Sequence, residues 1–290
     1  MYANARLMLL KALDAGYAVP SFNINGLEDI RGCLEAAEQA RSPVILQVYG
    51  GVFKRVPPDV LAAMADACIR RANVPVALHL DHGSGIAEVS TALRHGFTSV
   101  MVDGSRLPYE ENVALVKLVV EMAHAVDVPV EAELGHVGGA TERLTEEERI
   151  ARLTDPDQAA DFVKRTGVDS LAVSIGNAHG RYPSPPDLDL ARLERVAELT
   201  SVPLVMHGGS DSPPEQVRQA VSLGVAKFNV GTDIGIAFTD ALIGQAREAK
   251  QRPWGYAMLD AARAAVKEVA LAYIAMLGSA GYADEDAPWT

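Results

Sequence analysis

Histidines and carboxylates end several apolar runs of this sequence, where a strand that only packs would end on turn residues. The run VALHLDHG, residues 76–83, closes on Asp81 and His82, and two later apolar runs lead into His179 and His207. A glycine follows each of these three histidines. Three neutral imidazoles that leave a coordination position open are a common way to hold a catalytic divalent metal, zinc first. Beside such an ion, Asp81 either transfers a proton or orients a histidine, and we favour proton transfer.

The elements that must position these groups alternate regularly along the chain. Short apolar, β-rich runs are followed by helical patterns such as residues 27–41, 57–72 and 110–126. The eight runs cover residues 18–24, 43–49, 76–81, 99–103, 128–134, 170–176, 203–208 and 227–232. No linker rich in Pro, Gly or Ser divides them, so residues 1–290 are expected to form one domain. Eight such units predict an α/β fold, a (β/α)₈ TIM barrel; the competing doubly wound sheet is disfavoured because no GxGxxG pattern follows the first run.

The carboxyl ends of the strands in a parallel barrel meet at one face, and the active site lies there. The fourth run ends in Asp103, and the fifth carries Glu131 and Glu133. These groups are far apart in sequence but converge in space if the barrel forms. His79 lies two residues before Asp81 and should point to the same side of its strand, so we expect a core or supporting role for it.

Two glycine-bearing segments are suited to bind an anion. HGGSDSPPEQV places Gly208, Gly209 and Ser210 just before a helix expected near Pro213. NVGTD, residues 229–233, ends the eighth run and opens the next helix. Backbone amides at a helix N-terminus bind phosphate, and the loops after strands seven and eight are the recurrent phosphate site of such barrels.

Composition narrows the partners and the compartment. The chain of 290 residues carries a formal net charge of −12, which argues against nucleic acid or an anionic membrane as the main partner. No apolar run reaches the roughly 18 residues of a membrane span, and the N-terminal segment is expected to be an amphipathic helix rather than a signal peptide. The two cysteines, Cys33 and Cys68, lie inside helical patterns, and free thiols fit a cytoplasmic location.

A long helical pattern, about residues 256–277, follows the eighth unit and exceeds what the barrel needs. It either packs on the barrel or serves as a dimer arm, and the pattern leaves both open. The acidic end of the chain, residues 281–290, is expected to fray.

The motifs HLDHG, MVDGS, EAELGHVGG, DSLAVSIGNAHG, LVMHGGSD and KFNVGTD resemble those of the class II, zinc-dependent ketose-bisphosphate aldolases. The resemblance covers most of the chain and is nearest to the tagatose- and fructose-bisphosphate branch. It implies reversible aldol cleavage of a ketose phosphate or bisphosphate, which gives dihydroxyacetone phosphate and an aldehyde through a metal-stabilised enediolate. It also implies one catalytic Zn²⁺, with a monovalent cation as a further candidate, and a homodimer or homotetramer.

The same resemblance implies roles residue by residue. The residues that match metal-binding positions are His82, His179, His207, Glu133 and Asp103. The two acidic members match residues that sometimes offer the ion an alternative position. Asp81 matches the catalytic acid–base group at the substrate hydroxyl. The residues that match substrate-binding positions, most of them in a cradle for the dihydroxyacetone phosphate end, are Asn23, Gly180, Gly208, Gly209, Ser210, Asn229, Val230, Gly231 and Thr232.

Departures from the family pattern begin in two loops near the site. Relatives carry Gly-Gly-x-Glu-Asp after strand five, whereas this chain has GGATER, with Thr141 in place of the glutamate and Glu142 one position later. Either Glu142 takes over proton transfer at the nucleophilic carbon, or that step differs. Relatives also place a phosphate-binding lysine shortly after the His-Gly pair of strand six, and here Arg181 is the candidate substitute.

A third departure concerns the aldehyde half of the substrate. Relatives carry an arginine for its phosphate in the last helix, but Asp260 falls at that position, and the nearest basic residues are Arg252 and Arg263. Tyr49, at a position that is usually small, is expected to narrow the pocket. The hypothesis that follows is intact metal and enediolate machinery with an unusual, unphosphorylated aldehyde partner.

Two other functions stay open at this point. One is a barrel that uses the same three histidines to activate water for hydrolysis. The other is a non-catalytic partner subunit that stabilises an aldolase.

Overall fold

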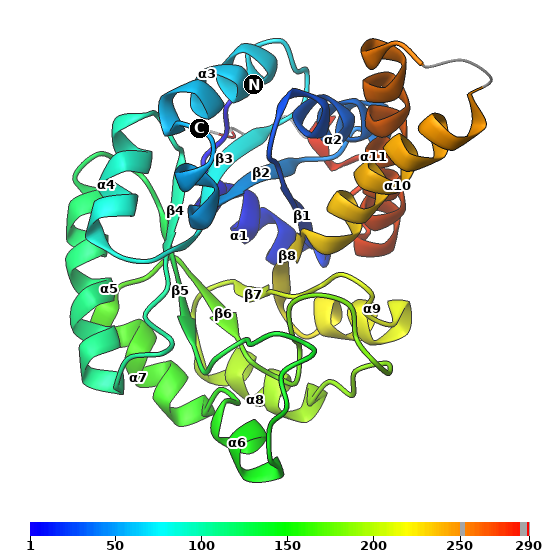
Figure 1. Cartoon of the computed structure of the whole chain (residues 1–290). Coiled ribbons are helices and arrows are strands. Elements are labelled where there is room, and N and C mark those ends of the chain that lie inside the picture. The colour runs from blue at the N-terminus through cyan, green and yellow to red at the C-terminus, as the bar shows by residue number, and fades with distance from the viewer. Residues whose placement is uncertain (250–252, 285–288, 290) are drawn as a thin grey trace.

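A closed barrel of eight parallel strands forms the centre of the molecule, which we describe from a computed structural model (Figure 1). The structure describes residues 1–249, 253–284 and 289. The strands are β1 Val19–Asn23, β2 Val44–Tyr49, β3 Val76–Gly83, β4 Ser99–Val102, β5 Val130–Leu134, β6 Ser170–Val173, β7 Leu204–Met206 and β8 Val225–Val230. Each pairs with the next, and β1 closes the ring by pairing with β8, where Ser21 lies opposite Asn229. The predicted TIM barrel and all eight predicted strands are confirmed.

Helices cover the outside of the barrel. In chain order they are α1 Ala5–Ala15, α2 Leu27–Ala40, α3 Pro58–Ile69, α4 Ile86–Arg94, α5 Tyr109–His124, α6 Glu146–Ala151, α7 Pro156–Thr166, α8 Leu190–Leu199, α9 Pro214–Ser222, α10 Thr232–Glu248 and α11 Gly255–Leu277, with 3₁₀ turns η1 Gly50–Lys54 and η2 Tyr282–Asp284. The strands are buried almost throughout because helices cover their outer face and side chains fill the interior. This arrangement explains why the strands read as near-continuous apolar runs.

Helix α1 closes the end of the barrel away from the strand carboxyl ends. Its buried side chains, Met8 and Leu9 among them, pack with residues at the starts of strands, such as Val19 and Ile45. Asn4 caps the helix, since its side chain accepts a hydrogen bond from the Leu7 amide. The opposite end is therefore the one open to solvent and ligand.

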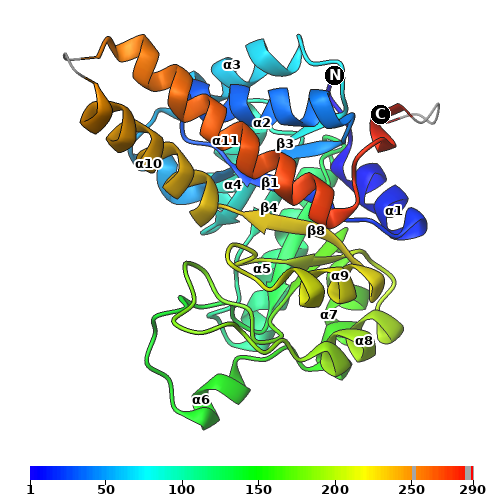
Figure 2. The ribbon, with the colours of Figure 1, turned by 90° about the vertical axis from the view of Figure 1, so that its right-hand side faces the viewer.

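The long predicted C-terminal helix is confirmed as α11. It packs against α2 and α10, and its contact with α2 is close, because a Cβ on Gly32 would lie 2.8 Å from a methyl carbon of Val266. Figures 1 and 2 show α10 and α11 running side by side and reaching beyond the barrel wall. Within the described residues, no helix is long and apolar enough to cross a membrane.

The expectation of a frayed C-terminus is wrong where the structure describes it. Trp289 is buried in the cluster around α1, and its carbonyl accepts a hydrogen bond from the Asn4 amide at 2.7 Å. Tyr282 stacks on Tyr17 at a ring separation of 4.1 Å. The acidic composition predicted a solvated end, but its aromatic residues pack instead. Residues 285–288 and 290 lie outside the described residues.

Candidate metal centre and active site

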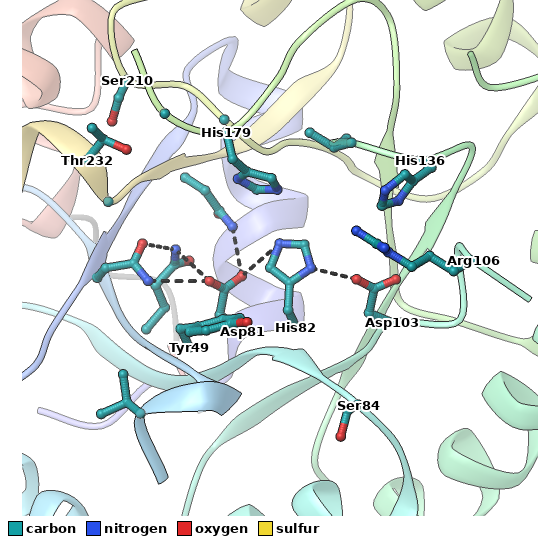
Figure 3. A pocket seen from close by; sticks show the side chains of 18 of the residues that line it. Tyr49, Asp81, His82, Ser84, Asp103, Arg106, His136, His179, Ser210 and Thr232 are labelled. Carbon is teal, nitrogen blue, oxygen red and sulfur yellow. Dashed lines mark hydrogen bonds and ion pairs between the residues drawn. The ribbon is translucent and has the colours of Figure 1, made fainter. Parts of the chain in front are cut away.

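A cavity of about 850 Å³ opens at the carboxyl ends of the strands, as the barrel predicts. Residues from the strands and from the loops that follow them, all around the ring, form its polar wall. The polar and glycine residues that line it are Asn23, Asn25, Gln47, Tyr49, Asp81, His82, Ser84, Asp103, Arg106, His136, His179, Gly180, Gly208, Ser210, Asn229, Gly231 and Thr232. We call this space the main cavity, and Figure 3 views it from close by.

Three histidines meet in this region although they come from three different strands. His82 is the second-to-last residue of β3, His179 lies in the loop after β6, and His207 directly follows β7. One ring nitrogen from each lies within 4.8 Å of the others. His82 has a positive φ of 46°, an uncommon conformation for a non-glycine residue that is held here by the surrounding fold.

The hydrogen bonds of these rings leave ligand atoms free. Nδ1 of His82 lies 2.8 Å from an oxygen of Asp103, while its buried Nε2 has no hydrogen-bond partner. Nε2 of His207 lies 2.8 Å from an oxygen of Glu131, while its buried Nδ1 has none. Metal-binding histidines are typically held in this way, with one nitrogen on a carboxylate and the other on the ion. The donor set therefore fits a divalent metal.

A second set of ligand atoms overlaps the first. His82, Asp103 and Glu133 also place one donor each within 4.8 Å of one another. Oε2 of Glu133 lies 3.3 Å from Nδ1 of His207 without hydrogen-bond geometry, and its Oε1 accepts from the Val137 amide at 3.0 Å. The two sets share His82.

Three side-chain amides surround the carboxylate of Asp81. Asn229 donates to one oxygen at 3.2 Å, and Asn23 and Gln47 donate to the other, each at 3.4 Å (Figure 3). Burial by itself raises the pKa of Asp81, but the attraction of His82 and the other nearby cations lowers it overall. The carboxylate is thus ionised and fixed beside the histidines, as a proton acceptor needs to be.

A buried ion pair lies beneath the histidines, inside the barrel. Nζ of Lys227, 1% exposed, is 2.9 Å from Oε2 of Glu131, whose other oxygen holds His207. Burial raises the pKa of Glu131, but Lys227 and His207 lower it well below the usual range. His79 completes this layer, with Nδ1 2.7 Å from the Ser99 hydroxyl, and burial lowers its pKa to about 3. The burial of His79 confirms the core position that was one of the two expected for it. Lys227 and Gln47 were missed because single polar residues inside apolar runs give no distinct signal.

The predicted phosphate cradle lies at one side of the main cavity. Gly231 precedes Thr232, the first residue of the 17-residue helix α10, so the helix N-terminus faces this side. Gly208 has a φ of 63°, and a Cβ there would collide with the carbonyl of Ala178. The Ser210 hydroxyl accepts a hydrogen bond from the backbone amide of Asp233.

Two predicted substrate-binding residues lie behind the cavity wall rather than on it. Val230 is fully buried, and Gly209 packs against the ring of Phe228 while its amide donates to the Asn229 carbonyl at 3.0 Å. The backbone of Gly209 is thus tied to that of Asn229.

The two loop residues singled out for proton transfer and phosphate binding lie off the cavity wall. Glu142 accepts from the Gly139 amide at 2.7 Å and pairs with Arg152 at 2.6 Å. Arg181 is exposed and follows Gly180, which does line the cavity. The loops themselves are joined, because the His179 amide donates to the Gly138 carbonyl at 2.8 Å.

Of the residues considered for the aldehyde side of the substrate, Arg263 is engaged in ion pairs and Tyr49 lines the main cavity. Arg263 pairs with Glu28, Glu35 and Asp260, so α11 uses it to hold α2. Arg252 lies outside the described residues. Tyr49 lines the cavity, 51% exposed, with its ring edge toward His82 at 6.4 Å between centroids.

Comparisons with known proteins assign the chain to a family. The family model of class II fructose-bisphosphate aldolases matches residues 3–282. The D-tagatose-1,6-bisphosphate aldolase subunit GatY of Klebsiella oxytoca is 43% identical over 278 residues, which is 96% of this chain and 98% of that protein.

Two solved structures share the fold. The YdjI aldolase of Escherichia coli K12 has a TM-score of 0.88 at 38% identity and covers 98% of this chain and 100% of its own. The fructose-bisphosphate aldolase of Campylobacter jejuni has a TM-score of 0.80 at 25% identity, with 95% and 94% covered. From these matches and the site geometry, the chain belongs to the class II fructose-bisphosphate aldolase family and is a carbon–carbon lyase.

Proposed function

We propose that this aldolase cleaves a ketose phosphate or bisphosphate to dihydroxyacetone phosphate and an aldehyde, and that one zinc ion is held by His82, His179 and His207. The observation that carries the proposal is the meeting of three ring nitrogens within 4.8 Å beside the amide-bound carboxylate of Asp81. When bound, the ion supplies Lewis-acid polarisation of the ketose carbonyl and stabilises the enediolate. Asp103 and Glu133 are proposed as its alternative position.

Each remaining step is assigned to a residue of this chain. The N-terminus of α10, with Ser210 and Thr232, binds the phosphate of the donor half. Asp81 takes the proton of the C4 hydroxyl as the C3–C4 bond breaks, and the three amides around it hold it in place. Glu142 is proposed to handle the proton at C3, which requires its loop to release Arg152 and turn toward the main cavity.

The hydrolase and partner-subunit alternatives are less well supported. A hydrolase needs no cradle for phosphate beside the metal ligands, and a supporting subunit needs neither a complete set of ligands nor a positioned carboxylate. The curated relative is named as an aldolase subunit, which is compatible with a catalytic chain that works in an assembly.

Location and assembly complete the proposal. Free Cys33 and Cys68 support a cytoplasmic protein. Residues 1–290 are proposed to act as one domain that forms a homodimer or homotetramer, with α11 as the arm. Trp254 and Tyr256, 74% and 68% exposed, support this role because large aromatic side chains are rarely left in water without a partner.

Proton exchange tests the donor half without knowledge of the aldehyde. Zinc-loaded protein is incubated with dihydroxyacetone phosphate in heavy water, and loss of the hydroxymethyl proton signal is followed by NMR. Metal-dependent exchange, abolished by a chelator, is expected. Absence of exchange in protein whose zinc content has been measured would refute the proposed donor or its base.

A further inference from the structure

The main cavity carries a positive charge at the side away from the phosphate cradle. Figure 3 shows Ser210 and Thr232 on one side, Arg106 on the other, and Asp81, His82 and His179 between them. Arg106 is the one lysine or arginine among the described residues that line this cavity. Within the part of the chain that the structure describes, no carboxylate pairs with its exposed guanidinium. The charge is therefore available to a ligand.

The backbone that carries Arg106 is fixed on several sides. The preceding residue, Ser105, donates its amide to Asp103 at 3.0 Å and contacts the ring of His136 at 2.9 Å. The Leu107 amide closes a turn on the Gly104 carbonyl at 2.9 Å. The guanidinium is thus free to adjust, while its attachment point stays at a constant place beside the metal ligands.

A second cavity of about 480 Å³ adjoins the first at this point. Arg106, Leu107 and His136 belong to both walls. The second cavity is also lined by Arg152 and by one acidic residue, Asp155. Arg106 consequently lies between two adjoining cavities, with space on both sides of it.

The direction of the substrate chain follows from the proposed function. The donor phosphate lies at the cradle and the C4 hydroxyl at Asp81, so the aldehyde half extends away from the cradle. Asp81 and Asp103 make this part of the wall acidic, which repels an anionic group unless a cation compensates. Arg263, the basic residue of α11 nearest the position where relatives bind a second phosphate, is held by carboxylates of α2 and α11.

We propose that Arg106 binds an anionic group, a carboxylate or a phosphate, at the end of the aldehyde half and thereby selects the acceptor. A guanidinium suits this task because its planar fork bonds both oxygens of such a group. The inference rests on the proposed function, since it takes the donor end and Asp81 as fixed points. In this chain Arg106, in the loop between β4 and α5, takes the place of the arginine that relatives carry in the last helix.

Two matched acceptor pairs test the charge preference in the condensation direction with dihydroxyacetone phosphate. Glyceraldehyde 3-phosphate is compared with glyceraldehyde, and 4-oxobutanoate with its neutral amide. The wild-type protein is expected to prefer the anionic member of at least one pair in kcat/KM, by about 10–100-fold for one charge-assisted contact. The pair that shows the preference identifies phosphate or carboxylate as the group recognised.

The variant Arg106→Gln is expected to lose this preference, mainly through KM of the anionic acceptor. Arg195→Gln, which changes an exposed arginine of α8 outside the cavity, is the control and should behave as wild type. Each acceptor rate is expressed relative to the donor proton exchange of the same variant.

The outcomes separate the two proposals. Donor exchange without any anion preference, or a preference that survives in Arg106→Gln, overturns the role of Arg106 and leaves the proposed function in place. A wild-type protein that exchanges no donor proton overturns the proposed function, and the inference falls with it.

Discussion

At the scale of single residues, the site depends on carboxylates whose charge is held by specific partners. Asp81 is held by three amides and Glu131 by Lys227 and His207. The first carboxylate faces the main cavity, and the second lies beneath the histidines proposed to bind the metal. Replacing Asp81 should therefore impair catalysis, whereas disturbing Glu131 should impair stability and metal binding.

Asp81→Asn keeps the size of the side chain but removes the proton acceptor. We expect the cleavage rate to fall by roughly 10²–10⁴, the range typical of general acid–base catalysis, while zinc content stays stoichiometric. Donor proton exchange should persist, because that proton leaves C3 and not the C4 hydroxyl. An equal loss of exchange and cleavage would place Asp81 at a different step.

Lys227→Met leaves Glu131 buried without its cation. We expect the free energy of unfolding to fall by about 3–5 kcal/mol, the usual cost of removing one partner of a buried ion pair. The double variant Glu131→Gln with Lys227→Met should recover much of that loss, because no charge remains uncompensated. Denaturant titration of zinc-free protein measures both changes, and a double variant less stable than the single one would contradict the pairing.

The same layer should also set metal affinity. Glu131→Gln replaces the carboxylate that fixes the ring of His207 with a neutral amide, so zinc affinity is expected to fall by roughly 10–100-fold, the usual cost of losing such a partner. Competition with a chromophoric chelator measures it. Glu194→Gln, on the outer face of α8, is the control and should leave the affinity unchanged.

At the scale of elements, glycines decide where loops can approach the site. Gly208 combines a positive φ with a close carbonyl, whereas Gly235, in α10, has open space around it. The same substitution should therefore have opposite effects at the two positions.

Gly208→Ala is expected to destabilise the protein by about 1–3 kcal/mol and to displace His207, because alanine is strained at that φ. Gly235→Ala should stabilise it by roughly 0.5–1 kcal/mol, the helix preference of alanine over glycine. The melting temperature and the zinc affinity of the two variants test these opposite effects. Equal effects would show that the backbone near Gly208 relaxes freely.

The loop after β5 carries Glu142, the residue proposed to act as the second base. If Glu142 acts at C3, Glu142→Gln should slow donor proton exchange by roughly 10²–10⁴. Glu146→Gln, in the adjacent α6, is the matched control because Glu146 likewise pairs with an arginine. Unchanged exchange in Glu142→Gln would exclude Glu142, and Thr141→Glu would then be the variant to examine.

At the scale of the whole molecule, the sequence predicted the barrel and the ends of its strands well. Eight apolar runs with helical spacers leave few alternative folds, and a motif such as HLDHG brings two site residues together within one strand. The Glu131–Lys227 pair could not be predicted, because its members are 96 positions apart and meet only across the closed barrel. The position of Glu142 depends on its pairing with Arg152, a contact that loop conformation decides and local sequence does not.

The assembly is the largest-scale property on which the proposal depends. Trp254 and Tyr256 stack at 6.3 Å where α11 begins, and Ile243 and Leu259 add exposed apolar surface on α10 and α11. In water this surface is unfavourable, so burial against a second copy is expected to stabilise a dimer. Trp254→Ser with Tyr256→Ser should shift the mass from a multiple of 30.8 kDa toward the monomer, measured by light scattering after size exclusion.

The same double variant shows whether the arm matters for the barrel itself. Neither side chain lines the main cavity, and the barrel core does not include them. Helical content and zinc binding should therefore survive dissociation, whereas the melting temperature becomes less dependent on protein concentration. If the variant keeps the wild-type mass, the contact between copies lies elsewhere, and the exposed faces of the other outer helices become the next surfaces to mutate.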